Sequence, residues 1–440
     1  MNPYRNTAQA LATTFLAGQL EVDGLDERGS HLLGRQWRWI RPLAQRIESR
    51  FGGMARPRIV VLTNFIMDDR GFHRATEKHK IRPVNRLGCT PIMGPTPKAA
   101  TWQVPAICTT GELAQWLQLT PGELDWMADL RSLESKQPRQ RLRHYHYRPL
   151  AKNHGNIRLI ESPKQRLKAV QHQIHTEILS HIPPHEAAHG FRRGRSIRTF
   201  AEPHTGKSVV LKLDLQDFFP SISFAWVQAL FRTAGYPERV ADSLAGLCTN
   251  ATPLDTWEND QFPAALENIR RVRWLYAKPH LPQGAPTSPA IANLCAYWLD
   301  CRLFGLAHAA GAVYTRYADD LAFSGNESFA RVAKRFQVHV CATAMEEGFQ
   351  VHHRKTRVMR QGVCQRLAGV VVNKHLNLPR NDLDRLKATL TNCIRYGVKG
   401  QNRTGHADFQ GHLNGRISFV ESINPSRGHK LRQMFDQIEW

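Results

Sequence analysis

Two adjacent aspartates stand between two short apolar runs. Asp319 and Asp320 follow Tyr317 and Ala318, and residues 313–317 and 321–325 flank them. This pattern predicts two short strands joined by a tight turn. Neighbouring carboxylates at such a turn repel each other unless a divalent cation offsets their charge. Asp319 and Asp320 are therefore candidate metal ligands, although a hairpin tip with two solvated acids would show the same pattern.

A third carboxylate lies upstream. Residues 208–215 are rich in β-branched and aliphatic side chains, carry Asp214 near their end and are followed by Pro220. Proline stops a central strand, and a rigid strand that ends in an acid holds a metal ligand firmly. Asp214 is thus predicted to be the third ligand.

Between these acids lies a loop that runs into a predicted helix. It reads Leu-Pro-Gln-Gly-Ala-Pro-Thr-Ser-Pro over residues 281–289. Ser288 fits a helix N-cap and Pro289 a first helical residue. Gly284 is expected to let a substrate approach the backbone, because glycine has no side chain.

The three motifs, in this order, resemble those of the reverse transcriptases, and specifically the bacterial retron-type group, over about residues 140 to 440. The resemblance implies that the strand with Asp214 is the first catalytic motif, residues 282–284 the nucleotide-pocket loop and residues 317–320 the catalytic hairpin. The implied fold is α+β: a right-hand polymerase with fingers and palm on an antiparallel sheet with helices, then a helical thumb. A mixed N-terminal extension precedes it.

The chemistry of nucleotidyl transfer gives an independent reason for these residue types. The reaction uses two Mg²⁺ ions, one at the primer hydroxyl and one at the triphosphate. Mg²⁺ prefers carboxylate and phosphate oxygens. Asp214, Asp319 and Asp320 supply such a ligand set and are the predicted catalytic residues.

The resemblance also assigns substrate contacts. Phe219 lies under the sugar and excludes a 2′-hydroxyl, which favours deoxynucleotides, and Gln283 with Gly284 shapes the pocket. Arg158 and Lys152, on a predicted hairpin, clamp the triphosphate, and Lys355 lies near the leaving pyrophosphate. The alternatives are a core aromatic for Phe219 and exposed charges without a role for Lys152 and Lys355.

A second group of residues is expected to hold nucleic acid. Glycines and arginines alternate over residues 189–197, which brings amides and positive charge close to phosphates. By resemblance this segment binds the template and residues 369–373 position the primer end; a solvated loop is the alternative for the first. The predicted contacts are Arg192, Arg193, Arg195, Tyr317 and Gly369.

Composition agrees with a polyanionic partner. The 440 residues include 60 Lys and Arg against 37 Asp and Glu, a formal net charge of +23. The eight cysteines form no C-x-x-C pair, which fits a reducing cytoplasm rather than a zinc or disulfide framework. No apolar run approaches the roughly 18 residues that a membrane span needs.

Four segments are expected. Residues 1–105 form an extension of unknown role, with a helix through Arg50 and a strand at residues 58–65. Residues 106–138 form a helix-turn-helix-like segment that packs or binds DNA, with capping boxes at Thr109 and Thr120. Residues 139–375 are the fingers and palm, with an insertion at residues 250–276 to which no role is assigned. Residues 376–440 are the thumb. In its first helix, one face is expected to carry Leu383, Leu386, Leu390 and Ile394.

The predicted function is RNA-directed DNA synthesis of the retron type. A structured noncoding RNA is copied from dNTPs into single-stranded, branched, RNA-linked DNA, in anti-phage defence with an effector protein. Residues 200–204 and 367–369 depart from the retron patterns N-A-x-x-H and V-T-G. Two alternatives remain open: a defence reverse transcriptase of another type, with another template or none, and a non-catalytic RNA-binding scaffold.

Overall fold

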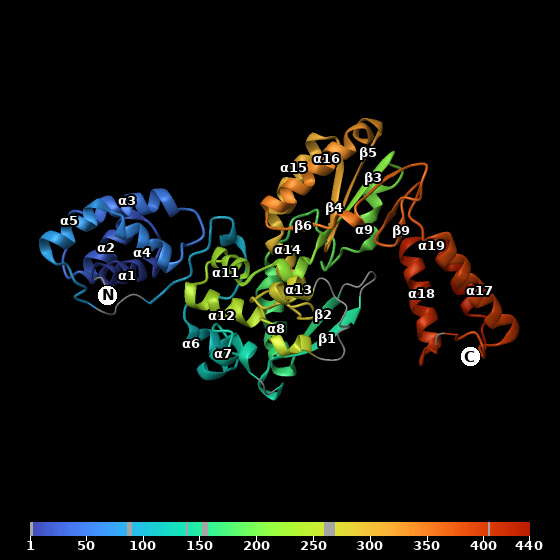
Figure 1. The fold of residues 1–440 in the computed structure, drawn as a ribbon, viewed down its shortest axis with the longest axis horizontal. Coiled ribbons are helices and arrows are strands. Elements are labelled where there is room, and N and C mark those ends of the chain that lie inside the picture. The colour runs from blue at the N-terminus through green and yellow to red at the C-terminus, as the bar shows by residue number, and fades with distance from the viewer. Residues whose placement is uncertain (1–2, 86–89, 138–139, 152–156, 259–268, 404) are drawn as a thin grey trace. The chain divides into compact units, whose positions relative to one another are not determined.

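The computed structural model describes residues 3–85, 90–137, 140–151, 157–258, 269–403 and 405–440 (Figure 1). The chain divides into two compact units, each built from two separate stretches. Unit 1 comprises Met1–Pro183 with Phe219–Cys295, and unit 2 comprises Pro184–Phe218 with Ala296–Trp440.

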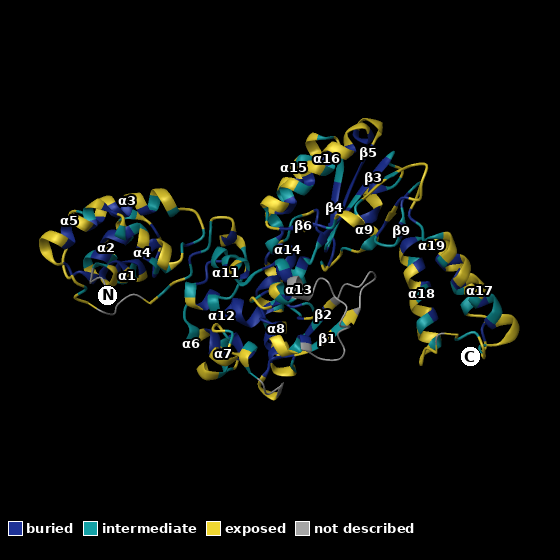
Figure 2. Cartoon of the chain, viewed as in Figure 1, coloured by how far each residue is buried: buried dark blue, intermediate teal, exposed yellow. Residues whose placement is uncertain are grey.

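Unit 1 begins with helices that pack around an apolar core, which Figure 2 shows as dark blue surfaces turned inward. Leu11, Phe15, Ile40, Leu62 and Phe72 are fully buried in this core. The helices are α1 (Pro3–Leu16), α2 (Val22–Leu32), α3 (Ile40–Phe51), α4 (Ile59–Met67) and α5 (Arg70–His79).

The strand predicted at residues 58–65 is wrong, because this segment is helix α4. The β-branched residues Val60 and Val61 favour a strand, yet both are exposed. Leu62 and Ile66, four residues apart, are fully buried. Burial at helical spacing outweighs the local strand propensity.

The predicted pair of short helices is present in unit 1. At α7, Thr120 and Glu123 form the complete capping box. At α6, Thr109 accepts from the Glu112 backbone, but the Glu112 carboxylate accepts from the Cys108 backbone, so the reciprocal half of the predicted box is missing. The elements here are η1 (Ala99–Thr101), α6 (Thr110–Trp116), α7 (Pro121–Ala128), η2 (Glu134–Lys136) and η3 (Gln140–Leu142).

The predicted hairpin is confirmed as the antiparallel strands β1 (Tyr145–Ala151) and β2 (Ile157–Pro163). Leu159, on β2, is fully buried and packs with Trp257 and Tyr276 of the insertion. The remaining helices at or beyond this hairpin are α8 (Gln165–Glu177), η5 (Leu179–His181), α10 (Phe218–Ser221), α11 (Phe224–Thr233), α12 (Glu238–Cys248), η7 (Leu254–Glu258), α13 (Ile269–Tyr276) and α14 (Ser288–Cys295).

Unit 2 is built on an antiparallel sheet of strand order β4-β5-β3-β6, with β7 also paired to β3. Neighbouring residues on β5 face opposite sides of the sheet. Phe323 packs on Phe336 of α16, whereas Ala322 belongs to the cluster with Phe200 of α9. Helices therefore cover both faces, as Figure 1 shows for α15 and α16 on one side.

The strands of unit 2 are β3 (Val209–Gln216), β4 (Val313–Tyr317), β5 (Asp320–Gly325), β6 (Gln350–Val351), β7 (Arg357–Arg360), β8 (Arg366–Leu367) and β9 (Val370–Val371). Its helices before the C-terminal segment are α9 (Ile197–Ala201), η6 (Glu202–His204), α15 (Tyr297–Ala309), α16 (Glu327–Glu346) and η8 (His353–Lys355). This arrangement is the expected α+β combination of helices with an antiparallel sheet.

The C-terminal helices share a separate apolar cluster. Leu383, Leu386 and Leu390 are buried as predicted, but Ile394 is 38% exposed and Cys393 is buried instead. The helices are α17 (Arg380–Tyr396), α18 (Phe409–Ile423) and α19 (Pro425–Phe435). Over the described ranges of the chain, no helix has both the length and the apolar character required to cross a bilayer.

Candidate active site

The three predicted carboxylates lie at one end of the unit 2 sheet. Asp214, near the end of β3, is paired across the sheet with Asp320, the first residue of β5. Asp319 stands in the turn between β4 and β5, and its carbonyl accepts a hydrogen bond of 2.8 Å from the Leu215 backbone. The strand register thus brings together acids that are about a hundred residues apart in sequence.

The electrostatics of these acids favour a bound cation. Burial raises the pKa of Asp319, and the negative charges of Asp214 and Asp320 raise it further. Burial also raises the pKa of Asp320, while the Lys212 ammonium opposes this shift. Holding like charges close together where they are partly buried costs electrostatic free energy, and a positive ion offsets this cost.

Two lysines provide positive charge in this structure. The Lys355 Nζ donates to both carboxylate oxygens of Asp214, at 2.8 and 2.9 Å. The Lys212 Nζ lies 2.9 and 3.0 Å from the two carboxylate oxygens of Asp320. Sequence reasoning singled out Lys355 but missed Lys212. The alternation of side chains along a strand could have identified Lys212, because it stands two residues before Asp214 and therefore lies on the same face.

The acids fit a magnesium site in chemical type and location, because hard carboxylate oxygens are the ligands that Mg²⁺ prefers. Among the residues that the structure describes, however, no three His, Cys, Asp or Glu side chains converge as a metal cluster. In this structure the lysine amines contact the oxygens of Asp214 and Asp320. Holding a metal at Asp214 therefore requires Lys355 to withdraw from it.

A buried ion pair supports the turn between β4 and β5 from behind. Arg316 and Asp300 are both fully buried, and the guanidinium Nε and Nη2 donate to the two Asp300 oxygens at 2.8 and 2.6 Å. The Arg316 Nη1 also donates to the Ala318 carbonyl, at 3.1 Å. Burial alone would lower the pKa of Arg316, but the Asp300 carboxylate outweighs burial and raises it. The sequence showed Arg316 only as one more basic residue on a strand.

The segment before α9 closes on the same turn. The Arg316 backbone N–H donates to the Ala187 carbonyl, and the His189 N–H donates to the Arg316 carbonyl, both at 2.7 Å. A Cβ on Gly190 would lie 2.7 Å from the Ala318 backbone nitrogen, so only glycine fits there. The predicted template-binding segment is therefore packed on the hairpin of β4 and β5.

Of the predicted nucleic-acid contacts, two are engaged in ion pairs. Arg192 and Arg195 both pair with Glu186, at 2.8 and 2.7 Å, whereas Arg193 is exposed. The Tyr317 ring lies beside the Phe200 ring, with a centroid distance of 5.7 Å. Gly369 has a φ of +88° and connects β8 to β9.

The segment that departs from the family pattern still holds a buried histidine. His204 is fully buried, and its two ring nitrogens lie 2.6 Å from Ser324 Oγ and 2.8 Å from Thr315 Oγ1. Burial lowers the pKa of His204 to about 3. The imidazole is therefore neutral, and it links the two strands of the catalytic hairpin.

The predicted nucleotide loop lies in unit 1, against strand β2. The Gln283 carbonyl accepts a hydrogen bond of 2.9 Å from the Glu161 backbone. Gly284 has a φ of +135°, and a Cβ there would lie 2.9 Å from the Glu161 carbonyl oxygen. The close approach that this glycine permits in the structure is thus to β2. Ser288 is not the predicted N-cap: α14 begins at Ser288, and its hydroxyl donates to the Pro282 carbonyl at 2.6 Å.

The other predicted substrate residues are Arg158, Phe219 and Lys152. Arg158 is exposed on β2, opposite Leu150. Phe219 is half-buried, whereas its neighbour Phe218 is buried, so only Phe218 is an ordinary core aromatic. Lys152 lies outside the described residues.

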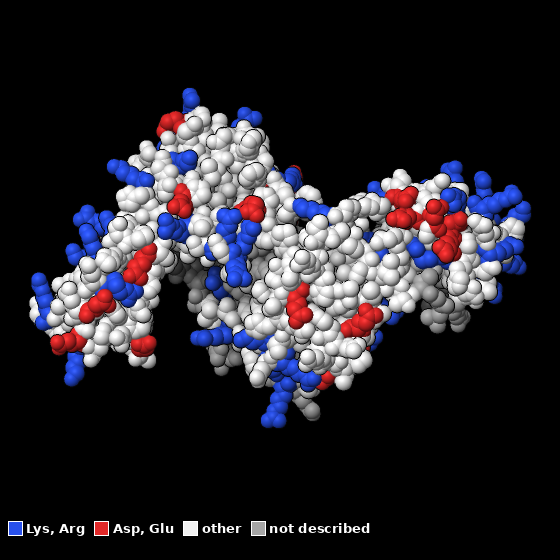
Figure 3. All heavy atoms as spheres, turned by 180° about the vertical axis from the view of Figure 1, so that it is seen from behind, with Lys and Arg blue, Asp and Glu red and all other residues white. Residues whose placement is uncertain are grey.

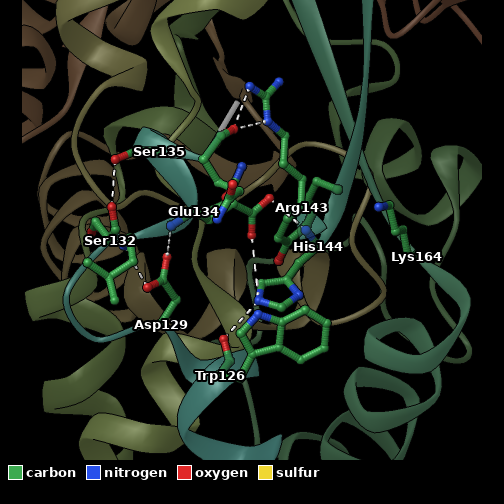
Figure 4. Close-up of polar contacts among 12 residues, drawn as sticks. Trp126, Asp129, Ser132, Glu134, Ser135, Arg143, His144 and Lys164 are labelled. Atoms are coloured by element: carbon green, nitrogen blue, oxygen red, sulfur yellow. Dashed lines mark hydrogen bonds and ion pairs between the residues drawn. The ribbon is translucent and has the colours of Figure 1, made fainter. Parts of the chain in front are cut away.

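A further buried acid anchors strand β1 (Figure 4). One carboxylate oxygen of Glu134 accepts a hydrogen bond of 2.7 Å from the His144 backbone. The ring Nε2 of His144 donates to the Trp126 carbonyl at 2.8 Å, and burial lowers the pKa of this imidazole. Burial raises the pKa of Glu134 to about 7. Sequence reasoning gave no sign of this cluster, which ties the helical segment to the hairpin.

The chain has clear relatives among known proteins. The sequence profile of the family described as reverse transcriptase (RNA-dependent DNA polymerase) matches residues 150–386, a range that contains every predicted site residue. Because this match covers more than half of the 440 residues, the chain belongs to the reverse transcriptase family.

Its relatives within that family are of the retron type. The chain is 42% identical to the Retron Mx65 reverse transcriptase of Myxococcus xanthus over 306 residues, which are 69% of this chain and 66% of that protein. It is 36% identical to the Retron Mx162 reverse transcriptase of the same organism over 341 residues, 74% of this chain and 66% of that protein. The Retron Ec86 reverse transcriptase of Escherichia coli is 27% identical over 284 residues, 64% of this chain and 77% of that protein. The alignments thus span about two thirds of the length of the two Myxococcus xanthus proteins.

Proposed function

We propose that the chain is an RNA-directed DNA polymerase of the retron type, which adds deoxynucleotides to a primer on an RNA template. The observation that carries this proposal is the strand register that pairs Asp214 with Asp320, next to Asp319 in the turn, within the region matched to the reverse transcriptase family. The buried Arg316 that holds their turn supports it further.

In this proposal the three carboxylates hold two Mg²⁺ ions. When bound, the metal lowers the pKa of the attacking hydroxyl and offsets the charge of the triphosphate. Lys355, whose amine now neutralises Asp214, contacts the leaving pyrophosphate and donates a proton to it. Lys212 keeps the Asp320 carboxylate oriented.

Residues of unit 1 select the nucleotide. Gln283 and Gly284 form the pocket loop, Arg158 and Lys152 bind the triphosphate, and the ring of Phe219 excludes a ribose 2′-hydroxyl. Phe219 is half-buried, whereas its neighbour Phe218 is buried, and this role needs an aromatic ring that is not wholly within the core. The substrates are therefore dNTPs.

The nucleic acid is a structured noncoding RNA and its branched, RNA-linked DNA product. The net charge of +23 supports this choice, and Figure 3 shows Lys and Arg side chains spread over the visible face. Arg192, Arg193, Arg195, Tyr317 and Gly369 contact the template and primer. The retron names of the relatives support the retron type. A cytoplasmic role in anti-phage defence with an effector protein is part of the same proposal.

Primer extension tests the polymerase. With an RNA template, a DNA primer, dNTPs and Mg²⁺, the wild-type chain should extend the primer. Asp319→Asn should reduce the rate at least about a thousandfold, equivalent to about 4 kcal/mol of transition-state stabilisation. The exposed Asp68→Asn is the control and should match wild type. Full extension by Asp319→Asn would refute the proposal.

Sequencing the nucleic acid that copurifies with the protein tests the retron type. DNA joined 2′,5′ to a structured RNA is the expected result. Unbranched or repetitive DNA would instead indicate another kind of defence reverse transcriptase, and RNA without DNA would indicate a binding scaffold.

A further inference from the structure

A fully buried acid lies directly behind the nucleotide loop. Glu161, on β2, has no exposed surface. Its carboxylate Oε2 lies 2.8 Å from His280 Nε2, and its Oε1 accepts from Thr252 Oγ1 at 2.7 Å and from Asn250 Nδ2 at 2.8 Å. All of these partners are buried in unit 1. A buried carboxylate persists only when its oxygens are satisfied in this way.

The surroundings of the histidine in this cluster favour its protonated form. Its Nε2 faces the Glu161 carboxylate, and its Nδ1 lies 2.8 Å from the Lys278 carbonyl. Both partners are acceptors, so both ring nitrogens of His280 donate, which is the doubly protonated form. Burial alone would lower the pKa of His280, but the charge and hydrogen bond of Glu161 outweigh it, and the pKa is raised.

The backbone of the same glutamate holds the loop. Its N–H donates to the Gln283 carbonyl at 2.9 Å, and its carbonyl oxygen lies where a Cβ on Gly284 would collide. The carboxylate of Glu161 thus holds β2 in place at this residue, and the backbone of the same residue contacts both Gln283 and Gly284. A change in the ion pair would move Gln283 and Gly284 without touching either of them.

The other end of the loop is tied to the same cluster. His280 and Asn250 exchange backbone hydrogen bonds of 2.9 and 3.0 Å, and the Leu281 N–H donates to the Ile222 carbonyl at 3.0 Å. Asn250 and Thr252 begin the insertion for which the sequence suggested no role. Its first residues therefore clamp the carboxylate behind the loop.

We propose that Glu161 and His280 are positioning residues of the nucleotide pocket: their buried ion pair sets the place of Gln283 and Gly284 and so determines the affinity for the incoming dNTP. Neither side chain touches the nucleotide. A binding group has to be held within about 0.5 Å of its productive position, so a shift of β2 weakens nucleotide binding. The inference rests on the proposed role of residues 282–284 as the nucleotide loop.

Steady-state primer extension on an RNA template, with the dNTP concentration varied, tests this role in Glu161→Gln. The dNTP KM should rise about tenfold and kcat should stay within about twofold. The affinity for the template-primer, measured by fluorescence anisotropy, should not change. The matched control is Gln171→Met on α8. Gln171 is fully buried in the same unit and bonds Leu247 and Tyr145, so its loss should lower Tm but leave the KM unchanged.

Two further variants complete the test. In Glu161→Gln/His280→Gln the KM should rise scarcely more than in either single variant, because the two side chains act as one pair. Thr252→Val removes one hydroxyl from Glu161, keeps the side-chain shape and should raise the KM about threefold. It serves as the test if Glu161→Gln does not fold.

An unchanged KM in these folded variants would overturn the positioning role. A parallel fall in kcat, template affinity and Tm with no specific KM effect would also overturn it, because that pattern indicates a structural contact only. Failure of the wild-type chain to extend any primer would refute the polymerase proposal instead. The two failures are therefore distinguishable.

Discussion

Each unit carries a predicted functional loop backed by a buried ion pair, and the two pairs differ in kind. In unit 2, Arg316 and Asp300 lie behind the turn between β4 and β5, and the guanidinium itself donates to Ala318 in that turn. In unit 1, the side chains of Glu161 and His280 pair with each other, and the Glu161 backbone, not its carboxylate, donates to Gln283 of the loop. The first pair acts directly on the turn, and the second acts through the strand that carries it.

The chemistry of the cations explains the difference. A guanidinium keeps its charge at every working pH and binds a carboxylate through a planar fork, so the Arg316 pair fixes a rigid turn. An imidazole changes charge near neutral pH, so the Glu161 pair is sensitive to its surroundings. The turn that carries Asp319 and Asp320 is thus supported directly by a permanent cation, whereas the loop of Gln283 and Gly284 is supported indirectly, through β2.

The largest expected effect is in unit 2. Arg316→Met should destabilise the protein by about 4 kcal/mol, because it leaves the buried Asp300 carboxylate without its cation. Urea denaturation followed by tryptophan fluorescence measures this change. The control is Arg302→Met, which removes exposed pairs with Glu346 and Glu347 and should leave the midpoint unchanged. If Arg316→Met cost no more than Arg302→Met, the buried pair would not support the turn.

Glu134 sharpens the comparison, because it is a buried acid beside an imidazole whose pKa is lowered by burial rather than raised by the acid. Its pKa of about 7 lies above the ordinary 4.5, so its proton is held more tightly in the folded state and stability falls as pH rises from about 4.5 to about 7. In Glu134→Gln this fall in stability with rising pH should be absent, because the amide does not titrate. At pH 8 the variant should be more stable than wild type by on the order of 2 kcal/mol, with little difference at pH 4.

The measurement for Glu134→Gln is urea denaturation at both pH values. Glu77→Gln, an exposed glutamate on α5, is the control and should follow the wild-type pH dependence. A variant that is less stable than wild type at pH 8 would show that the charged carboxylate is needed for its hydrogen bonds to β1.

The smallest expected effect separates the two ion pairs by pH. The pKa of His280 is raised on folding, so the stability that it contributes is complete below about pH 6.5 and is lost as pH rises through the raised value. The deficit of His280→Gln relative to wild type should therefore shrink by roughly 1 kcal/mol between pH 6 and pH 9. The deficit of Arg316→Met should be the same at both pH values, since the guanidinium does not titrate. Thermal denaturation at the two pH values compares the variants, and equal pH dependence in both would remove the distinction.

The strands and the turn that carry the candidate site could be predicted from the sequence, because they depend on local sequence signals. A strand that ends in Asp214 and a turn that carries Asp319 and Asp320 follow from alternation and turn residues, and the hairpin of β1 and β2 follows from the same signals. The prediction of a strand at residues 58–65 was wrong for a related reason. The β-branched Val60 and Val61 gave the local signal, while the burial of Leu62 and Ile66 was decided by neighbours far along the chain.

The sequence by itself therefore determined the family, the order of the motifs and the acids that can hold a metal. Only the tertiary structure decided which of the many charged residues are buried in pairs. Arg316 and Glu161 look like ordinary surface charges in a chain with 60 basic and 37 acidic residues, and no periodicity marks their partners Asp300 and His280. Burial makes a charge costly unless a partner meets it, and whether one does depends on contacts that only the folded chain creates.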